Sequence, residues 1–528
     1  MLIVEIGQMD EITLRQQVDE LFASALKRTA NLPALTNFHN LLQQCHQRLN
    51  QPMRVAIVGL IKAGKSTMMN ALLGETVVAT GAVEATFNVN WLRYGEKPSL
   101  LVHFKDSRRP PEPKPVEELA ALTLRAEENR DYLLSIKYIE VDYPNPILQT
   151  FNLIDTPGLK SFYQDDSVNT LKFLQLHGDE LTAVTQQEAS NADAVLYLFS
   201  HSFGAEDKLI VEQFQGPAVG QATPINAIGV LTKVDVYDVP EPMIDGHRVA
   251  RRLSAHGQVT NLFYTIYPVC GLLAWGAQTL TPDEFAILLE LTQISRSRFE
   301  SLLQNVERFE QREYPDIPVP PEKRRILLQR LGQYGVGLAD KLIRQGINNQ
   351  ADLSNELLKR SGVPELRDLI LSHFGHRAFL IKLSTGLRQI DTVAFQERQR
   401  LGGTLRQIVD EIAGKFEAIN SQEHAFKELE VLRSYYEGKL EFDTEEVKQL
   451  LQVTGEYGTS CGERLGLDDR ATIAEMLTTA AERTSYWHQR ADDFFGGDRQ
   501  TLTAAKVLAR SYDRILYRVQ KAKEYLEI

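Results

Sequence analysis

Residues 59–66 read GLIKAGKS, which matches the phosphate-binding pattern GxxxxGKS, and the apolar run RVAIV at 54–58 precedes them. In such a loop, successive backbone N–H groups curl around the α- and β-phosphates of a nucleotide, and the helix that follows points its positive end at them. We expect Lys65 to reach the β- and γ-phosphates and the Ser66 hydroxyl to hold Mg²⁺. The pattern and its preceding strand therefore predict a nucleotide-binding site.

Two further strand ends indicate that the nucleotide carries guanine. Residues 151–158 read FNLIDTPG. Asp155 is expected to hold Mg²⁺ through a water, and the N–H of Gly158 is expected to meet the γ-phosphate. Residues 227–235 read AIGVLTKVD. The Asp235 carboxylate accepts from both N1–H and the 2-amino group of guanine, a donor pair that adenine lacks. GTP or GDP with Mg²⁺ is the predicted ligand.

The predicted nucleotide contacts all follow a predicted strand or lie in the phosphate-binding loop. They are Gly59, Ile61, Lys62, Ala63, Gly64, Lys65, Ser66, Thr67, Asp155, Gly158, Thr232, Lys233, Asp235, Cys270 and Gly271. The last two belong to PVCG at 268–271, where a final base-contacting loop is expected, and a plain strand end is the alternative explanation. Ser66, Thr86 and Asp155 are the predicted Mg²⁺ ligands.

The threonine expected to sense the γ-phosphate lies between this helix and the strand NVNWLRY at 88–94. Thr86 is our choice, and Thr80 is the competing candidate. In the GTP-bound protein, the hydroxyl of this threonine joins Mg²⁺ and its backbone meets the γ-phosphate. We prefer Thr86 because it almost abuts the next strand, as the threonine of this phosphoryl-transfer template does.

Composition favours a large cytoplasmic protein. The chain has 528 residues with 70 acidic and 58 basic side chains, and its net charge of −12 disfavours nucleic-acid binding. Cys45, Cys270 and Cys461 are far apart and match no metal or redox spacing, so we expect reduced thiols. The start MLIVE at 1–5 is unlike a secretory leader, and no apolar stretch predicts a membrane span. Any membrane contact is expected to be peripheral, on the inner face of the cell membrane.

The hydrophobic pattern predicts an α/β domain with helices before and after it. Residues 1–50 carry apolar residues at helical spacing with a break at Asn31-Leu32-Pro33, which predicts a helical hairpin. Residues 51–280 alternate strands with helices, so we expect a mostly parallel sheet flanked by helices. Residues 281–528 carry long segments with a 3.6-residue period. We expect them to form an elongated all-α bundle together with the N-terminal hairpin.

The chain resembles the bacterial dynamin-like proteins, a branch of the dynamin superfamily of large GTPases. The likeness rests on GLIKAGKST at 59–67, ATFNVNWLRYG at 85–95, IEVDYPNPILQTFNLIDTPGL at 139–159 and TKVD at 232–235, and it covers about the first half of the chain. It implies a dynamin-type GTPase domain that hydrolyses GTP to GDP and phosphate. It also implies that this domain dimerises across its nucleotide face and moves a helical stalk, in membrane remodelling.

Two positions in the loop depart from eukaryotic dynamins. Those proteins carry glutamine and serine where this chain has Ile61 and Lys62, and they use them to position the attacking water and to bind a monovalent cation. Ile61 cannot position water. The Lys62 ammonium can replace the cation's charge beside the β–γ bridge, and a lysine that points into solvent is the alternative. Lys62, Lys65 and Thr86 are thus the candidates for direct roles in hydrolysis, and slow intrinsic turnover is expected.

A lipid-binding tip is the weakest part of the resemblance. Its best candidate is HFGHRAFLIKL at 373–383, where basic and apolar residues occur together. Ordinary helix core is the favoured alternative, because Val363, Leu366 and Leu369 continue the same apolar stripe. Two functions remain open: a GTPase that self-associates and acts at a membrane surface, and a soluble switch whose helical half binds a protein partner.

Overall fold

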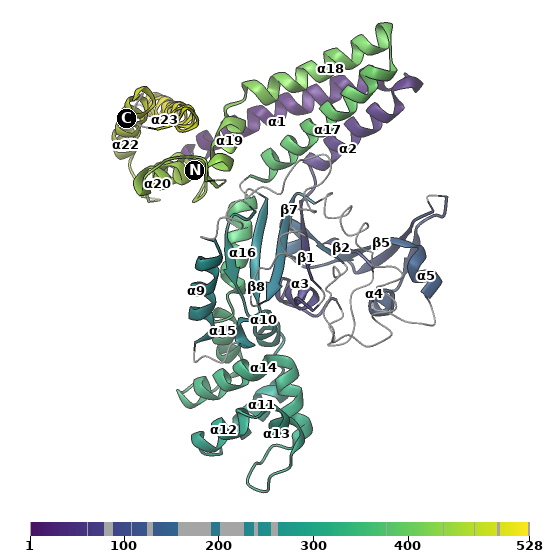
Figure 1. Cartoon of the computed structure of the whole chain (residues 1–528), viewed down its shortest axis with the longest axis vertical. Helices are drawn as coiled ribbons and strands as arrows, with labels where there is room; N and C mark the ends of the chain where they lie inside the picture. The colour runs from purple at the N-terminus through teal and green to yellow at the C-terminus, as the bar shows by residue number, and fades with distance from the viewer. Residues whose placement is uncertain are drawn as a thin grey trace. The chain divides into compact units, whose positions relative to one another are not determined.

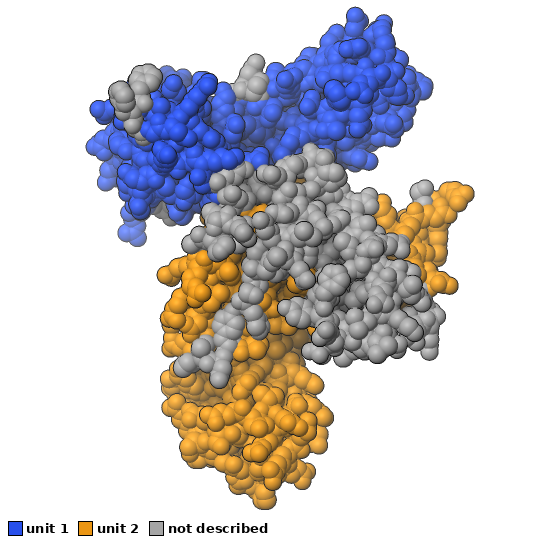
Figure 2. All heavy atoms as spheres, in the orientation of Figure 1, with its two compact units in different colours: residues 1–53, 217–226, 370–528 blue, residues 54–216, 227–369 orange. Residues whose placement is uncertain are grey.

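The structure is a computed structural model of the whole chain. It describes residues 2–60, 62–78, 88–106, 108–123, 130–156, 192–200, 226–236, 241–254, 262–375, 377–436, 438–468, 470–493 and 497–525. The chain divides into two compact units (Figure 2). Unit 1 comprises residues 1–53, 217–226 and 370–528, and unit 2 comprises residues 54–216 and 227–369.

Unit 2 is built around one sheet, which contains nine strands among the described residues (Figure 1). Its order is β4-β3-β5-β2-β6-β1-β7-β8-β9. The strands are β1 (Met53–Gly59), β2 (Asn90–Tyr94), β3 (Ser99–Phe104), β4 (Glu112–Lys114), β5 (Ile136–Tyr143), β6 (Phe151–Asp155), β7 (Ala194–Ser200), β8 (Ala227–Thr232) and β9 (Ile266–Pro268).

The half of the sheet that carries the phosphate-binding loop is parallel. β1 pairs with β7, β7 with β8 and β8 with β9, all in parallel. Every residue of β8 is buried, as expected of a strand covered on both faces. The other half is mixed, because β2 is antiparallel to β6 and β3 is antiparallel to both β4 and β5. The predicted α/β fold with a mostly parallel sheet is confirmed.

The helices of unit 2 lie between the strands of the sheet and after them in sequence. Its described helices are α3 (Lys65–Leu73), α4 (Leu119–Thr123), α5 (Arg130–Ser135), α6 (Ile147–Thr150), α9 (Pro242–Ser254), α10 (Gly271–Gln278), α11 (Pro282–Leu291), α12 (Arg296–Leu303), α13 (Val306–Gln311), α14 (Pro321–Arg344), α15 (Gln350–Lys359) and α16 (Val363–Leu369), with 3₁₀ turns η2 (Val116–Glu118) and η4 (Val234–Val236).

The sequence placed the end of the GTPase domain at residue 280, whereas the structure keeps residues 281–369 in the same unit as the sheet. The reason is packing onto α10. Gly276 of α10 faces the backbone oxygen of Arg330 in α14. Arg330 Nε also donates to Glu284 Oε1 at 2.9 Å, and its Nη2 donates to Thr279 O at 2.8 Å. These contacts attach the helices after residue 280 to the sheet unit.

Gly276→Ala is expected to lower the free energy of unfolding of unit 2 by about 1–3 kcal/mol. A Cβ at this position would clash with the Arg330 backbone oxygen, which cannot rotate away. Thermal unfolding without nucleotide measures the loss. Gly271→Ala, in the same helix, is the control because its Cβ would have no neighbour closer than 3.8 Å. Equal stability of the two variants would contradict this account of the α10–α14 contact.

The described residues of unit 1 are mainly helical and come from both ends of the chain. Its elements are α1 (Leu2–Thr29), η1 (Pro33–Leu35), α2 (Thr36–Leu49), a π-helical segment η5 (Ile370–Gly375), α17 (Ala378–Arg400), α18 (Gly403–Gln422), α19 (His424–Tyr436), α20 (Thr444–Val453), α21 (Cys461–Leu465), α22 (Ile473–Asp492) and α23 (Arg499–Tyr525). The α1–α2 hairpin lies beside α17 and α18 (Figure 1). The expected bundle of N- and C-terminal helices is therefore confirmed.

Two apolar cores hold unit 1 together. The first joins Phe22 of α1 and Phe38 of α2 to Phe416 of α18, and the second lies among α19–α23 around Trp487. The Lys382 ammonium donates to the carbonyl oxygens of Leu49 at 2.9 Å and Gln51 at 2.6 Å. These hydrogen bonds attach the C-terminal end of the hairpin to α17.

The candidate lipid-binding tip at 373–383 belongs to this interior. His373 is fully buried, and Phe374, Phe379 and Leu383 are at most 4% exposed. Side chains packed inside a helical bundle are not available to insert into lipid, so the helix-core interpretation holds and the tip assignment is wrong. No helix among the described residues combines the length and apolarity needed to cross a membrane.

Candidate nucleotide-binding site

The phosphate-binding loop has the strand–loop–helix geometry that its sequence predicts. β1 ends at Gly59 and α3 begins at Lys65. A Cβ at Gly59 would clash with the backbone oxygen of Leu198 in β7, so the close approach of the two strands requires glycine there. Gly64 precedes α3 with φ of 90°, a left-handed conformation that glycine adopts without a steric penalty. The local chain therefore takes the shape needed to curl around phosphate.

Lys65 lies over the loop rather than pointing into solvent. Its Nζ donates to the carbonyl oxygens of Gly59 at 3.3 Å and Leu60 at 3.0 Å. The residue is 7% exposed. Burial lowers the pKa of Lys65 to about 8, while the nearby Asp155 carboxylate opposes that shift. A desolvated ammonium in this position attracts phosphate strongly, because the surrounding protein screens its charge less than water does.

Asp155 ends β6 in a buried position that suits a carboxylate holding Mg²⁺ through a water. Its Oδ2 lies 3.5 Å from Asn90 Nδ2, and its Oδ1 is buried with no hydrogen-bond partner among the described residues. Burial raises the pKa of Asp155 to about 6, and the charge of Lys65 and the Asn90 hydrogen bond oppose it. A buried carboxylate oxygen costs free energy unless it accepts a hydrogen bond. A water bound to Mg²⁺ would supply that donor, so this residue fits the predicted ion.

The end of β8 brings the predicted base-recognition motif to the loop. Thr232 Oγ1 lies 2.9 Å from Ala63 O and 3.1 Å from Phe199 O. Lys233 has a positive φ of 57°. Burial lowers the pKa of Lys233, Asp235 opposes the shift, and Lys62 adds to it. The ammonium groups of Lys62 and Lys233 therefore disfavour each other's charge.

Cys270 lies near Asp235, and Gly271 lies against α3. Cys270 is fully buried before α10, and burial together with the Asp235 charge raises its pKa. Gly271 begins α10 against α3, since its Cβ would lie 3.9 Å from Thr67 Cγ2. The structure thus places the predicted final base-contacting loop, Cys270-Gly271, near Asp235, the predicted base-recognition residue, and near α3.

Several predicted site residues lie outside the described residues. These are Ile61, Thr80, Thr86 and Gly158. Lys62 is described, exposed and held at a positive φ of 64°. Ser66 and Thr67 occupy the second and third positions of α3.

Gly332 lies beside Asp235, the predicted base-recognition residue, and the sequence motifs do not single it out. It interrupts α14 with φ 71° and ψ 171°, a backbone conformation essentially confined to glycine. A Cβ at Gly332 would lie 3.4 Å from Asp235 Oδ2 and 3.5 Å from Leu272 Cδ2. Glycine inside a helical pattern was the available signal. The 3.6-residue apolar period expected over residues 281–528 continues across this break.

The fold and the site together define a P-loop nucleotide-binding domain of the GTPase class. The model of the dynamin family matches residues 55–234. Over 477 residues the chain is 30% identical to isoniazid-induced protein IniC of Mycobacterium tuberculosis, covering 90% of this chain and 92% of that relative. It is also 32% identical over 140 residues to dynamin-like protein 2 of Campylobacter jejuni, covering 26% of this chain and 22% of that protein. The chain belongs to the bacterial dynamin-like GTPases.

A solved structure also aligns with most of the chain. It is described as an oligomerised bacterial dynamin pair for sensing and tethering membranes. The alignment covers 98% of this chain and 91% of that one, with 15% identity and a TM-score of 0.33. Membership of the family follows from the sequence relatives.

Proposed function

We propose that this protein binds GTP with Mg²⁺ and hydrolyses it to GDP and phosphate. One observation carries the proposal: the Thr232–Ala63 contact joins the end of β8 to the phosphate-binding loop, and the buried Lys65 after that loop interacts electrostatically with Asp155 at the end of β6. A guanine nucleotide bound to both motifs would place its phosphates against Lys65 and its base against Asp235. Family membership supports the same activity.

Each residue has a defined task in this proposal. Loop N–H groups would bind the α- and β-phosphates, Lys65 would reach the β- and γ-phosphates, and Asp235 would orient guanine. Ser66, Thr86 and Asp155 would hold Mg²⁺, with Asp155 accepting from a bound water. When bound there, Mg²⁺ would supply positive charge that offsets the negative charge of the phosphates. The chemistry otherwise depends on positioning, which buried and hydrogen-bonded side chains provide.

Lys62→Ala is expected to slow GTP hydrolysis by at least about tenfold while changing the Kd for GTP by less than about threefold. The Lys62 ammonium would stabilise charge that develops beside the β–γ bridge only in the transition state. Single-turnover rates and a fluorescent-nucleotide titration measure the two quantities. Equal losses in rate and affinity would show that Lys62 acts in binding, and no change in either would support its pointing into solvent.

We also propose that GTP drives self-association through the GTPase domain and that this association moves the helical unit at a membrane surface. Membership of the dynamin-like family supports this, since the resemblance implies dimerisation and movement of a helical stalk. The burial of His373, Phe374, Phe379 and Leu383 removes one lipid-binding candidate but leaves a peripheral membrane role open. The alternative is a soluble switch whose helices bind a protein partner.

Turnover per molecule, measured against protein concentration with and without anionic liposomes, separates these functions. Self-association predicts a rate that rises with concentration, and membrane action predicts a further rise together with sedimentation on liposomes in GTP. Failure to sediment, with an unchanged rate, would reject the membrane role. A rate independent of concentration would reject self-association. An absence of GTP hydrolysis under every condition would reject the proposed activity itself.

A further inference from the structure

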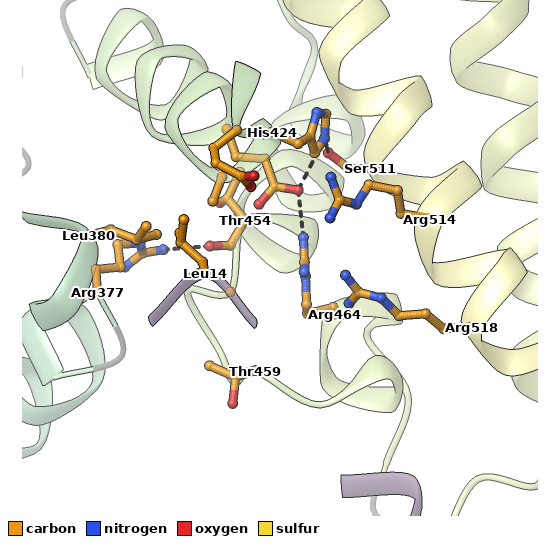
Figure 3. A pocket seen from close by; sticks show the side chains of 14 residues that line it. Leu14, Arg377, Leu380, His424, Thr454, Thr459, Arg464, Ser511, Arg514 and Arg518 are labelled. Atoms are coloured by element: carbon orange, nitrogen blue, oxygen red, sulfur yellow. Dashed lines mark hydrogen bonds and ion pairs between the residues drawn. The ribbon is translucent and has the colours of Figure 1, made fainter. Parts of the chain in front are cut away.

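Unit 1 contains a cavity lined in part by Arg464 of α21 and by Arg514 and Arg518 of α23 (Figure 3). Arg464 Nη2 lies 2.7 Å from Glu428 Oε1 of α19. Burial opposes ionisation of Glu428, yet Arg464 and His424 lower its pKa to about 2. This ion pair joins α19 to α21 within unit 1 and needs no ligand.

In unit 2, the backbone of α14 approaches Asp235 at Gly332. A Cβ at Gly332 would lie 3.4 Å from Asp235 Oδ2 and 3.5 Å from Leu272 Cδ2. Leu272 belongs to α10 and follows Cys270-Gly271, the predicted final base-contacting loop. The break in α14 and the first turn of α10 therefore lie together beside the predicted base-recognition carboxylate.

Contacts before and after the break hold α14 against α10. A Cβ at Gly276 of α10 would clash with the backbone oxygen of Arg330. Gly335, on the other side of the break, lies so close to α10 that its Cβ would be 3.0 Å from Leu273 Cδ1. Gly332 itself has φ 71° and ψ 171°, a conformation that persists only where surrounding contacts enforce it. The position of Gly332 is thus fixed by packing on both sides of it.

The Asp235 carboxylate gains from hydrogen-bond donors that a ligand supplies. It is half-buried, and burial raises its pKa because the charged form loses hydration. Guanine offers two donors, N1–H and the 2-amino group, which approach the two carboxylate oxygens. A methyl group in contact with Oδ2 would occupy space beside that oxygen without supplying a hydrogen bond.

We propose that Gly332 is a specificity-determining residue for guanine, because the bare backbone at this point of α14 keeps Asp235 Oδ2 open to an N–H donor of the base. Leu272 supplies an apolar surface beside the same carboxylate, which limits competition from water. The inference rests on the proposed GTP binding and deepens it, since it assigns base selectivity to a helix beyond the two nucleotide motifs. The alternative is a glycine required only for the shape of α14.

Gly332→Ala is expected to raise the Kd for GDP by roughly 10- to 100-fold, because it weakens a hydrogen bond to a charged group. Titration calorimetry of the full chain with GDP and Mg²⁺ measures the change. Gly346→Ala is the matched control: Gly346 also has a positive φ, 118°, but no described atom beyond its chain neighbours would lie within 4 Å of a Cβ there. Its Kd for GDP is expected to stay within about threefold of the original value.

The same substitution in an Asp235→Ala background separates a role in base recognition from a structural one. There Gly332→Ala is expected to change the Kd for GDP by less than about threefold, because the oxygen that its methyl group would cover is absent. An equal loss in both backgrounds would show that Gly332 acts only through the shape of α14 and would overturn the proposal. Unchanged affinity in Gly332→Ala, while the original chain binds GDP, would also overturn it.

A second variant keeps the test decisive if Gly332→Ala does not fold. Leu272→Ala, at a half-buried position of α10, is expected to raise the Kd for GDP about three- to tenfold in the original chain and not in the Asp235→Ala background. No change in either background would then reject the proposal. An original chain that binds no GDP at all would reject the proposed function, whereas GDP binding with unaffected variants rejects only the role of Gly332.

Discussion

Lys65→Ala is expected to weaken binding of both GDP and GTP by roughly 100-fold or more. The Lys65 ammonium is buried, within 3.3 Å of the carbonyl oxygens of Gly59 and Leu60, and a nucleotide would place its β-phosphate beside it. Alanine removes both the positive charge and its hydrogen bonds in a site where water screens charge weakly. Equilibrium titration with fluorescent GDP, in Mg²⁺ and in EDTA, measures the change.

Lys62→Ala provides the control for this measurement, because Lys62 is an exposed lysine of the same loop. Its GDP affinity is expected to remain near that of the original protein. If Lys65→Ala retained full affinity while still folded, the loop would not bind phosphate in the proposed way. Unfolding curves of both variants exclude a general loss of structure as the cause.

Asp235→Asn is expected to reduce GDP affinity by at least about 100-fold and to create affinity for xanthosine diphosphate. The carboxylate accepts two hydrogen bonds from guanine, whereas an asparagine amide offers one acceptor and donors. Xanthine carries a C2 carbonyl where guanine carries its 2-amino group, so the amide N–H finds an acceptor. Competition of the two diphosphates against a labelled nucleotide measures the switch.

Burial raises the pKa of the Asp235 carboxyl, so its environment already disfavours a charge without partners. Asp245→Asn is the control, since the Asp245 carboxylate pairs with Arg248. It should leave GDP preferred over xanthosine diphosphate. A loss of GDP affinity in Asp235→Asn without any gain for the xanthine nucleotide would contradict direct base recognition.

Much of the phosphate site could be predicted because its parts are contiguous in the chain. Gly59, Gly64 and Lys65 lie within seven residues, and their strand–loop–helix geometry follows from local conformational preference. Asp155 and Asp235 were recognised because each follows an apolar strand. Parallel strands bring such ends to one edge of the sheet, so the strand pattern also predicted their convergence.

Other features depend on contacts between distant segments. Gly332 reaches Asp235 because α14 breaks beside the base motif, and an apolar period does not reveal which helix packs there. The unit boundary after residue 369 follows from the contact of Gly276 with the Arg330 backbone, not from a change in composition. Likewise, 373–383 carries a pattern compatible with both lipid contact and core, and burial decided between them.

The sequence by itself determined the class of nucleotide site, the α/β fold around it and the dynamin resemblance, because those depend on short motifs and local periodicity. Only the tertiary structure decided where the sheet unit ends, what covers Asp235, and that Arg464, Arg514 and Arg518 share one cavity. Burial, ion pairing and cavity formation depend on which side chains meet after folding. The residues adjacent in sequence do not specify those side-chain contacts.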